Sequence, residues 1–207
     1  MSDQSPGLYL VTPVLQQAES FLPALREALT GADIASLLLR LGPLEDAAAA
    51  RLVRAIAAPT QAQGAALIID GAPALALEAG ADGVHVDGVG APLAAAIKRL
   101  SPGHIVGAGG LATRDDAMTA GEAGADYLLF GDGAEPPDLA ALLERVKWWA
   151  EIFNTPCVAL AQSLEEVGPL AAAGADFVML GDWVWRDPRG PAAAVAAARR
   201  AIAEQGA

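Results

Sequence analysis

Charged, hydroxyl-bearing and glycine residues follow several of the apolar runs in this chain of 207 residues. Carboxylates in such positions can hold a divalent metal ion, an arginine can bind phosphate oxygens, and a histidine can transfer a proton. The candidates are Thr12, Arg40, Asp70, His85, Asp87, Gly109, Asp132, Gln162, Ser163, Asp182 and Trp183. They can act together only if the fold brings the ends of these runs to one place.

Four copies of Gly-Ala-Asp show how the chain is organised, at residues 31–33, 80–82, 124–126 and 174–176. Each copy follows an alanine-rich amphipathic segment and precedes an apolar run. Since glycine readily adopts the left-handed conformation that ends many helices, each copy predicts a helix-to-strand junction. The copies are 49, 44 and 50 residues apart, which is too long for one helix-strand unit, so each interval should hold two units and the chain eight.

The expected strands are near-continuous apolar runs, a pattern typical of strands covered on both faces of a parallel sheet. They are residues 8–12, 34–39, 65–69, 83–86, 104–107, 127–130, 156–160 and 177–180. Helices are expected at about residues 15–30, 43–62, 72–79, 91–100, 112–123, 138–153, 163–173 and 190–205. This alternation predicts an α/β fold, a (β/α)8 TIM barrel forming one domain over residues 1–207. A doubly wound open sheet is the alternative.

Ligands of such a barrel bind at the carboxyl ends of the strands, where all the candidate residues stand. The prediction is therefore one acidic mouth. Arg40 ends a leucine run and would either bind a ligand or pair with Asp70. His85 would act in positioning or in catalysis, and Trp183 with Trp185 would stack on a flat heterocycle or fill space. The aspartates of the Gly-Ala-Asp copies begin their strands at the opposite end and are expected to be structural.

The composition, with 54% hydrophobic and 18% charged residues, is that of a globular domain with a large core. No stretch is apolar enough to cross a bilayer, and the net charge of −12 argues against nucleic acid and anionic membrane as partners. The first six residues lack the features of a secretory signal, which predicts a cytoplasmic protein. Cys157, the only cysteine, is expected to be a buried apolar residue without an intrachain disulfide.

Five segments of the chain together form a distinctive pattern. The most distinctive is residues 75–86, which read Leu-Ala-Leu-Glu-Ala-Gly-Ala-Asp-Gly-Val-His-Val. The others are residues 8–12, 67–70, 121–131 and 172–178. In this combination the chain resembles the thiamine phosphate synthase family over nearly its whole length. Members of that family join a pyrimidine pyrophosphate to a thiazole phosphate and release pyrophosphate with the help of Mg²⁺, and a related branch tautomerises a thiazole carboxylate phosphate. The resemblance implies a transferase of thiamine biosynthesis with a small heterocyclic phosphate as ligand.

The resemblance also implies roles for the candidate residues. Asp70 would be one Mg²⁺ ligand, and Asp87 is the nearest substitute for a second carboxylate that the family has at about Gly90. Arg40 and His85 are the catalytic candidates. The remaining ones would contact the substrate: Thr12, Gly109, Asp132, Gln162, Ser163, Asp182 and Trp183.

Several positions depart from the family's pattern. Its Gln-x-Arg-x-Lys falls on Leu38, Arg40 and Gly42, and its Asn-Asp-Arg on Asp70-Gly71-Ala72. A lysine expected after the sixth strand has no counterpart in residues 131–138. A Gly-Gly-Ile phosphate cradle is replaced by Ala161-Gln162-Ser163, and small residues with a serine are replaced by Gly181-Asp182-Trp183. An aspartate beside a phosphate repels it, so these replacements predict weak phosphate binding and low or absent synthase activity.

Two functions from different classes therefore remain open. The first is a thiamine phosphate synthase that uses Asp70 and Asp87 as metal ligands and Arg40 on phosphate oxygens. The second is a catalytically inactive barrel that binds a small molecule or another protein. In either case Trp148, Trp149 and Phe153 form an aromatic patch on an outer helix, which predicts a homodimer, as is common among the related enzymes.

Overall fold

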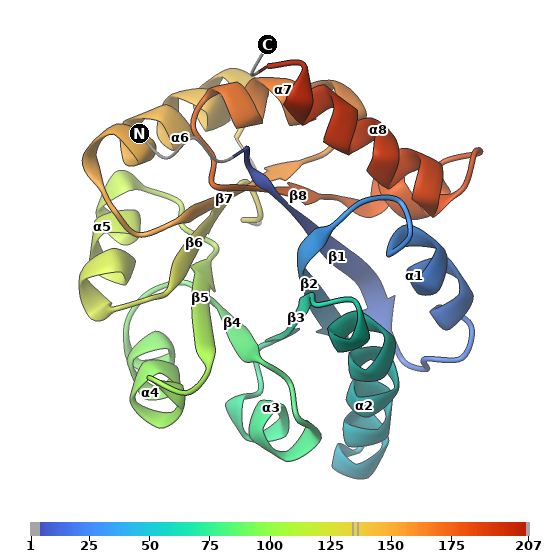
Figure 1. Cartoon of the computed structure of the whole chain (residues 1–207). Coiled ribbons are helices and arrows are strands. Elements are labelled where there is room, and N and C mark those ends of the chain that lie inside the picture. The colour runs from blue at the N-terminus through green and yellow to red at the C-terminus, as the bar shows by residue number, and fades with distance from the viewer. Residues whose placement is uncertain (1–4, 134, 136, 206–207) are drawn as a thin grey trace.

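The strands of the computed structural model, which describes residues 5–133, 135 and 137–205, form a closed parallel barrel in the order β1 to β8. Each strand pairs with its sequence neighbours, and β8 closes the ring on β1, while the helices surround the strands (Figure 1). The strands are β1 Gly7–Leu15, β2 Ile34–Leu41, β3 Ala66–Asp70, β4 Gly83–Asp87, β5 Ile105–Gly109, β6 Tyr127–Phe130, β7 Cys157–Ala161 and β8 Phe177–Leu180. The single-domain TIM barrel is therefore confirmed, and the open sheet is excluded.

The helices alternate with the strands, as the sequence predicts. They are α1 Leu22–Ala28, α2 Asp46–Ala62, α3 Pro73–Ala79, α4 Ala91–Leu100, α5 Arg114–Ala123, α6 Leu139–Ile152, α7 Leu164–Ala172 and α8 Pro191–Ala203, with a 3-10 helix η1 at Asp182–Arg186. Within the described residues, none of the helices has the length and apolar character needed to span a membrane.

Alternate side chains of the strands divide the core into two parts. One set fills the barrel interior and consists of Tyr9, Val11, Leu38, Ile68, Tyr127, Leu129, Val158 and Met179. The larger set points outward and packs against the helices. Cys157 belongs to the outer set, which confirms the expected buried cysteine, and burial raises the pKa of its thiol to about 12.

The region after β1 differs from the sequence prediction of a helix over residues 15–30. β1 extends to Leu15 because its pairing with β2 resumes beyond an irregularity between Val11 and Val14. Leu15 also accepts a hydrogen bond from the Gly42 amide at 2.8 Å. Pro13, which has no N–H to donate, lies within the irregularity. As a result α1 begins only at Leu22.

The Gly-Ala-Asp glycines end helices as predicted in three of the four copies. Gly80, Gly124 and Gly174 have φ angles of 75°, 94° and 99°, in the left-handed region. Gly31 differs, because it has no positive φ and instead lies against α8, where a side chain would meet the Ala192 carbonyl and Val195. Its small size serves close packing rather than a helix cap.

The aspartates of the same three copies connect neighbouring strands at the amino-terminal end of the barrel. Asp82 accepts a hydrogen bond from the Leu67 amide at 2.7 Å. Asp126 accepts from Val106 at 2.7 Å, and Asp176 accepts from Cys157 at 2.8 Å. Each carboxylate thus satisfies a backbone N–H of a fully buried residue in the preceding strand. The predicted structural role of these aspartates is confirmed.

Replacing Asp126 with alanine is expected to lower the free energy of unfolding by about 1–3 kcal/mol, because it leaves the Val106 amide without its partner. Urea denaturation measures this change. Asp33→Ala is the matched control, since Asp33 is exposed and accepts no hydrogen bond within the described residues. Equal stability of the two variants would contradict the structural role of Asp126.

The aromatic patch on α6 is smaller than the sequence predicts. Trp149 is only 1% exposed, stacks on Phe153 with ring centroids 4.0 Å apart, and donates its indole N–H to the Thr155 carbonyl at 2.8 Å. It lies three positions after Val146 and so shares the buried stripe of α6. Trp148 and Phe153 remain partly exposed. The expectation that both tryptophans face outward is wrong for Trp149, and the homodimer stays a prediction supported by Trp148, Phe153 and the exposed Ile152.

Candidate functional site

The register of the sheet brings several candidate residues together at the carboxyl end of the barrel. Asp70 of β3 pairs with His85 of β4, and Asp87 of β4 pairs with Gly109 of β5. Asp70, Asp87 and Gly109 end their strands, and His85 lies inside β4 on the same face as Asp87, so these residues meet at one mouth, as the strand-end rule predicts.

His85 is held in a fixed orientation by two tyrosines from the barrel interior. Its side chain is 2% exposed, and its Nδ1 lies 3.0 Å from the Tyr127 hydroxyl. The Tyr127 hydroxyl in turn lies 3.0 Å from that of Tyr9. Burial raises the pKa of both phenols, so both remain neutral hydrogen-bonding groups. Sequence analysis missed the two tyrosines, although their positions on inward-facing sites of β1 and β6 could have indicated them.

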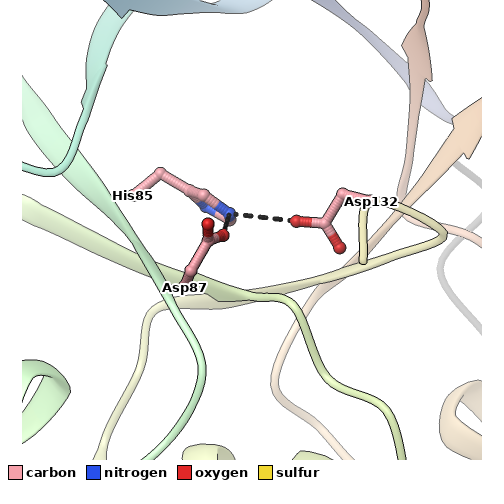
Figure 2. A group of neighbouring side chains, drawn as sticks. All are labelled: His85, Asp87 and Asp132. Atoms are coloured by element: carbon pink, nitrogen blue, oxygen red, sulfur yellow. Dashed lines mark hydrogen bonds and ion pairs between the residues drawn. The ribbon is translucent and has the colours of Figure 1, made fainter. Parts of the chain in front are cut away.

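The other ring nitrogen of His85 faces two carboxylates. Its Nε2 lies 3.4 Å from Asp132 Oδ2 and 4.0 Å from Asp87 Oδ1 (Figure 2). Asp132 is mostly buried and accepts hydrogen bonds from the Gly110 amide at 3.1 and 3.2 Å, whereas Asp87 is 76% exposed. These three residues, called the His85 cluster below, place one possible ligand atom each within 4.8 Å of the others.

Gly109 makes the approach of His85 to Asp132 possible. A Cβ at this position would overlap both His85 Nε2 and Asp132 Oδ2. Its neighbour Gly110 has a φ of 62°, in the left-handed region, and its N–H donates to the Asp132 carboxylate. The sequence indicated Gly109 as a point of close approach to a ligand, and in the structure the groups that approach it belong to the chain itself.

Asp70 lies at the rim of the same mouth but outside the His85 cluster. Partial loss of hydration raises its pKa, and the negative charges of Asp87 and Asp132 act in the same direction, whereas His85 and Arg40 oppose them. Asp70 also lines a groove of about 470 Å³ between the loops that follow β2 and β3. The mouth is therefore acidic, as predicted.

The Mg²⁺ that the resemblance implies was predicted at Asp70 and Asp87. Mg²⁺ favours six oxygen ligands in octahedral geometry. Among the described residues the only group of three or more potential ligands includes Asp87 but not Asp70, and it contains a buried imidazole nitrogen. This donor set fits Mg²⁺ poorly, and the assignment of Mg²⁺ to Asp70 and Asp87 stays a prediction.

Arg40 forms an ion pair with Asp182 rather than with Asp70. Its Nη2 lies 2.7 Å from Asp182 Oδ1, and its Nε donates to the Thr12 carbonyl at 2.6 Å. The Thr12 hydroxyl, which is fully buried, accepts a hydrogen bond from the Arg40 amide at 3.0 Å. Two of the candidate residues, Thr12 and Asp182, thus hold the guanidinium in place.

The loops after β7 and β8 are also occupied by groups of the chain. The backbone N–H of Gln162 donates to Glu166 Oε2 at 2.7 Å. A carboxylate of the chain therefore occupies this N–H at the expected phosphate cradle. Ser163 directly precedes α7. The indole of Trp183 donates to the Ala161 carbonyl at 3.1 Å, and that of Trp185 donates to the Val11 carbonyl at 2.7 Å. These anchored indoles favour the space-filling interpretation. Sequence analysis missed Glu166.

Comparisons with known proteins identify relatives over almost the whole chain. A family model described as thiamine monophosphate synthase matches residues 8–182. The chain is 40% identical to the thiamine-phosphate synthase of Rhodospirillum centenum over 194 residues, covering 91% of this chain and 94% of that protein. It is 37% identical to the thiamine-phosphate synthase of Hyphomonas neptunium over 200 residues, covering 92% and 90%. A thiamine phosphate pyrophosphorylase from Pyrococcus furiosus shares the fold, with a TM-score of 0.80, 22% identity and 97% of each chain covered.

Proposed function

Because the chain belongs to the thiamine monophosphate synthase family, we propose that its barrel mouth binds a pyrimidine pyrophosphate and a thiazole phosphate and couples them slowly. In this reaction the thiazole nitrogen forms a bond to the pyrimidine methylene carbon. The bond from that carbon to the pyrophosphate oxygen breaks, and pyrophosphate leaves with the electron pair. The protein contributes mainly by positioning the two substrates and stabilising the charge of the leaving group.

One observation supports a slow reaction: carboxylates of the chain occupy groups that could bind substrate anions. Asp182 pairs with Arg40 at 2.7 Å, and Glu166 accepts from the Gln162 amide at 2.7 Å. Asp132 likewise accepts from the Gly110 amide. Phosphate oxygens prefer such cations and backbone N–H groups. A substrate phosphate must therefore compete with an internal carboxylate for Arg40 Nη2 and for these two backbone N–H groups, which weakens its binding.

The same observation supports the second candidate, a barrel that binds a small heterocyclic phosphate without turning it over. Under this alternative the substrates would bind, but no thiamine phosphate would form. Calorimetric binding of each substrate, measured beside the rate of product formation, separates the two functions.

The deciding experiment measures thiamine phosphate and pyrophosphate formed by the purified protein from both substrates and Mg²⁺. We expect turnover well below about one per second, the low end of ordinary enzyme rates. Turnover near about one per second that Asp70→Ala abolishes would contradict the proposal of a slow enzyme and would assign a central role to Asp70.

A further inference from the structure

We propose that the His85 cluster is a binding site for one divalent transition-metal ion of the Zn²⁺ type. The ion would be held by His85 Nε2 and by one carboxylate oxygen each from Asp87 and Asp132. Imidazole suits Zn²⁺, Co²⁺ and similar ions, whereas Mg²⁺ favours oxygen ligands alone. The inference concerns the ion only and does not depend on the proposed coupling reaction.

The distances in the cluster are close to those of a filled site. Metal–ligand bonds of about 2.0–2.2 Å place the donor atoms of a tetrahedral site about 3.4 Å apart. Asp132 Oδ2 already lies 3.4 Å from His85 Nε2. Asp87 Oδ1 is 4.0 Å from the same nitrogen, and its side chain is 76% exposed and free to rotate inward. Only this exposed carboxylate has to move.

The imidazole is oriented as metal-binding histidines are. Such histidines usually form a hydrogen bond through their second nitrogen, and this contact fixes the ring. His85 makes this contact from Nδ1 to the Tyr127 hydroxyl, which is itself bonded to Tyr9. The His85 side chain is only 2% exposed. Because its Nδ1 faces Tyr127, only Nε2 is directed at the carboxylates of the mouth.

Gly109 and Gly110 prepare the position of the second ligand. A Cβ on Gly109 would overlap both His85 Nε2 and Asp132 Oδ2, so the space that brings these two atoms together exists only with glycine. The Gly110 amide holds the Asp132 carboxylate from the other side. The steric fit at Gly109 and the hydrogen bonds from Gly110 thus support the site separately from its negative charge.

The charge around the cluster also favours a cation. The negative charges of Asp87 and Asp132 act on Asp70 in the same mouth, and the guanidinium of Arg40 is paired with Asp182. Two positive charges at the cluster would offset two of these carboxylates. The mouth could then attract an anionic ligand that it otherwise repels.

The test uses the tag-free protein after treatment with EDTA, without any substrate. Calorimetric titration with ZnCl₂ should show one ion per chain, bound Co²⁺ should develop visible absorption, and MgCl₂ at the same concentration should give no saturable heat. Asp87→Asn and Asp132→Asn should each weaken Zn²⁺ binding by at least about 10- to 100-fold, the range known for loss of supporting contacts. Tyr127→Phe, which removes only a positioning contact, should fall within that range.

Two matched controls keep the result specific. Asp70→Asn removes a carboxylate from the same mouth but outside the cluster, so it takes away a charge but no ligand and should weaken Zn²⁺ binding far less than Asp87→Asn or Asp132→Asn. The chain has two histidines, and His104→Gln removes the one at the opposite end of the barrel, so it should retain the wild-type affinity for Zn²⁺. Thermal unfolding confirms that each variant is folded. Asp87→Asn is the substitution expected to disturb folding least, because the Asp87 side chain lies largely in solvent.

Two results would overturn the proposal. One is Zn²⁺ binding that survives both Asp87→Asn and Asp132→Asn. The other is Mg²⁺ binding as tight as Zn²⁺ binding and lost in Asp70→Asn, which would restore the carboxylate pair of the sequence prediction. Because no substrate is present, either result can be obtained whether or not the protein performs the coupling reaction.

Discussion

Replacing Asp182 with serine is expected to raise the affinity of the barrel mouth for inorganic pyrophosphate by about 10- to 100-fold. In the wild-type protein Asp182 lies 2.7 Å from Nη2 of the Arg40 guanidinium and accepts the hydrogen bond that an anion could receive from it. Serine removes the negative charge, and a hydrogen bond to a charged group contributes about 1.5–3 kcal/mol, which corresponds to this range. Serine is also the type of residue that the family resemblance places after the eighth strand.

Calorimetric titration with pyrophosphate measures the effect of Asp182→Ser directly. The double variant Arg40→Ala with Asp182→Ser should lose the gain, because the freed guanidinium is then absent. Asp33→Ser removes the same charge at the opposite end of the barrel and controls for the change in net charge. If Asp33→Ser binds pyrophosphate as tightly as Asp182→Ser, the ion pair has no specific role.

Replacing Trp149 with alanine is expected to lower the free energy of unfolding by about 3–5 kcal/mol, the usual cost of truncating a large buried aromatic side chain. Trp149 is 1% exposed and packs against Phe153 and Phe130, with ring centroids 4.0 and 6.0 Å away. The variant also leaves the Thr155 carbonyl without its indole donor. Urea denaturation followed by circular dichroism gives the difference in stability.

Trp148→Ala is the matched control for Trp149→Ala. Its ring is partly exposed and lies under the Arg114 guanidinium at 4.8 Å, so its loss should cost far less stability. If Trp148→Ala lowered the free energy of unfolding as much as Trp149→Ala, the proposed link between the burial of Trp149 and its contribution to stability would be wrong. Sedimentation of the same Trp148→Ala protein tests the proposed homodimer, because this variant should associate more weakly if Trp148 lies in the contact.

The order and type of the elements were determined by the sequence alone. The Gly-Ala-Asp copies mark helix-to-strand junctions through the backbone freedom of glycine, and the apolar runs between them have the pattern of strands buried on both faces. These are local properties, and a run of eight such units can bury its strands by closing into a barrel. Closure then sets which strand ends meet, so the location of the mouth and its acidic character also followed from the sequence.

The partners of the charged and polar side chains were decided only by the tertiary structure. Arg40 pairs with Asp182, which is 142 positions away, although Asp70 was the partner considered from the sequence. His85 meets Asp132 at a separation of 47 positions, and Tyr9 meets Tyr127 at a separation of 118. These contacts depend on strand register and side-chain direction to within a few ångströms, since hydrogen bonds and ion pairs weaken steeply with distance. No local pattern encodes such distances, because they arise only when eight strands from the whole chain have closed into one ring.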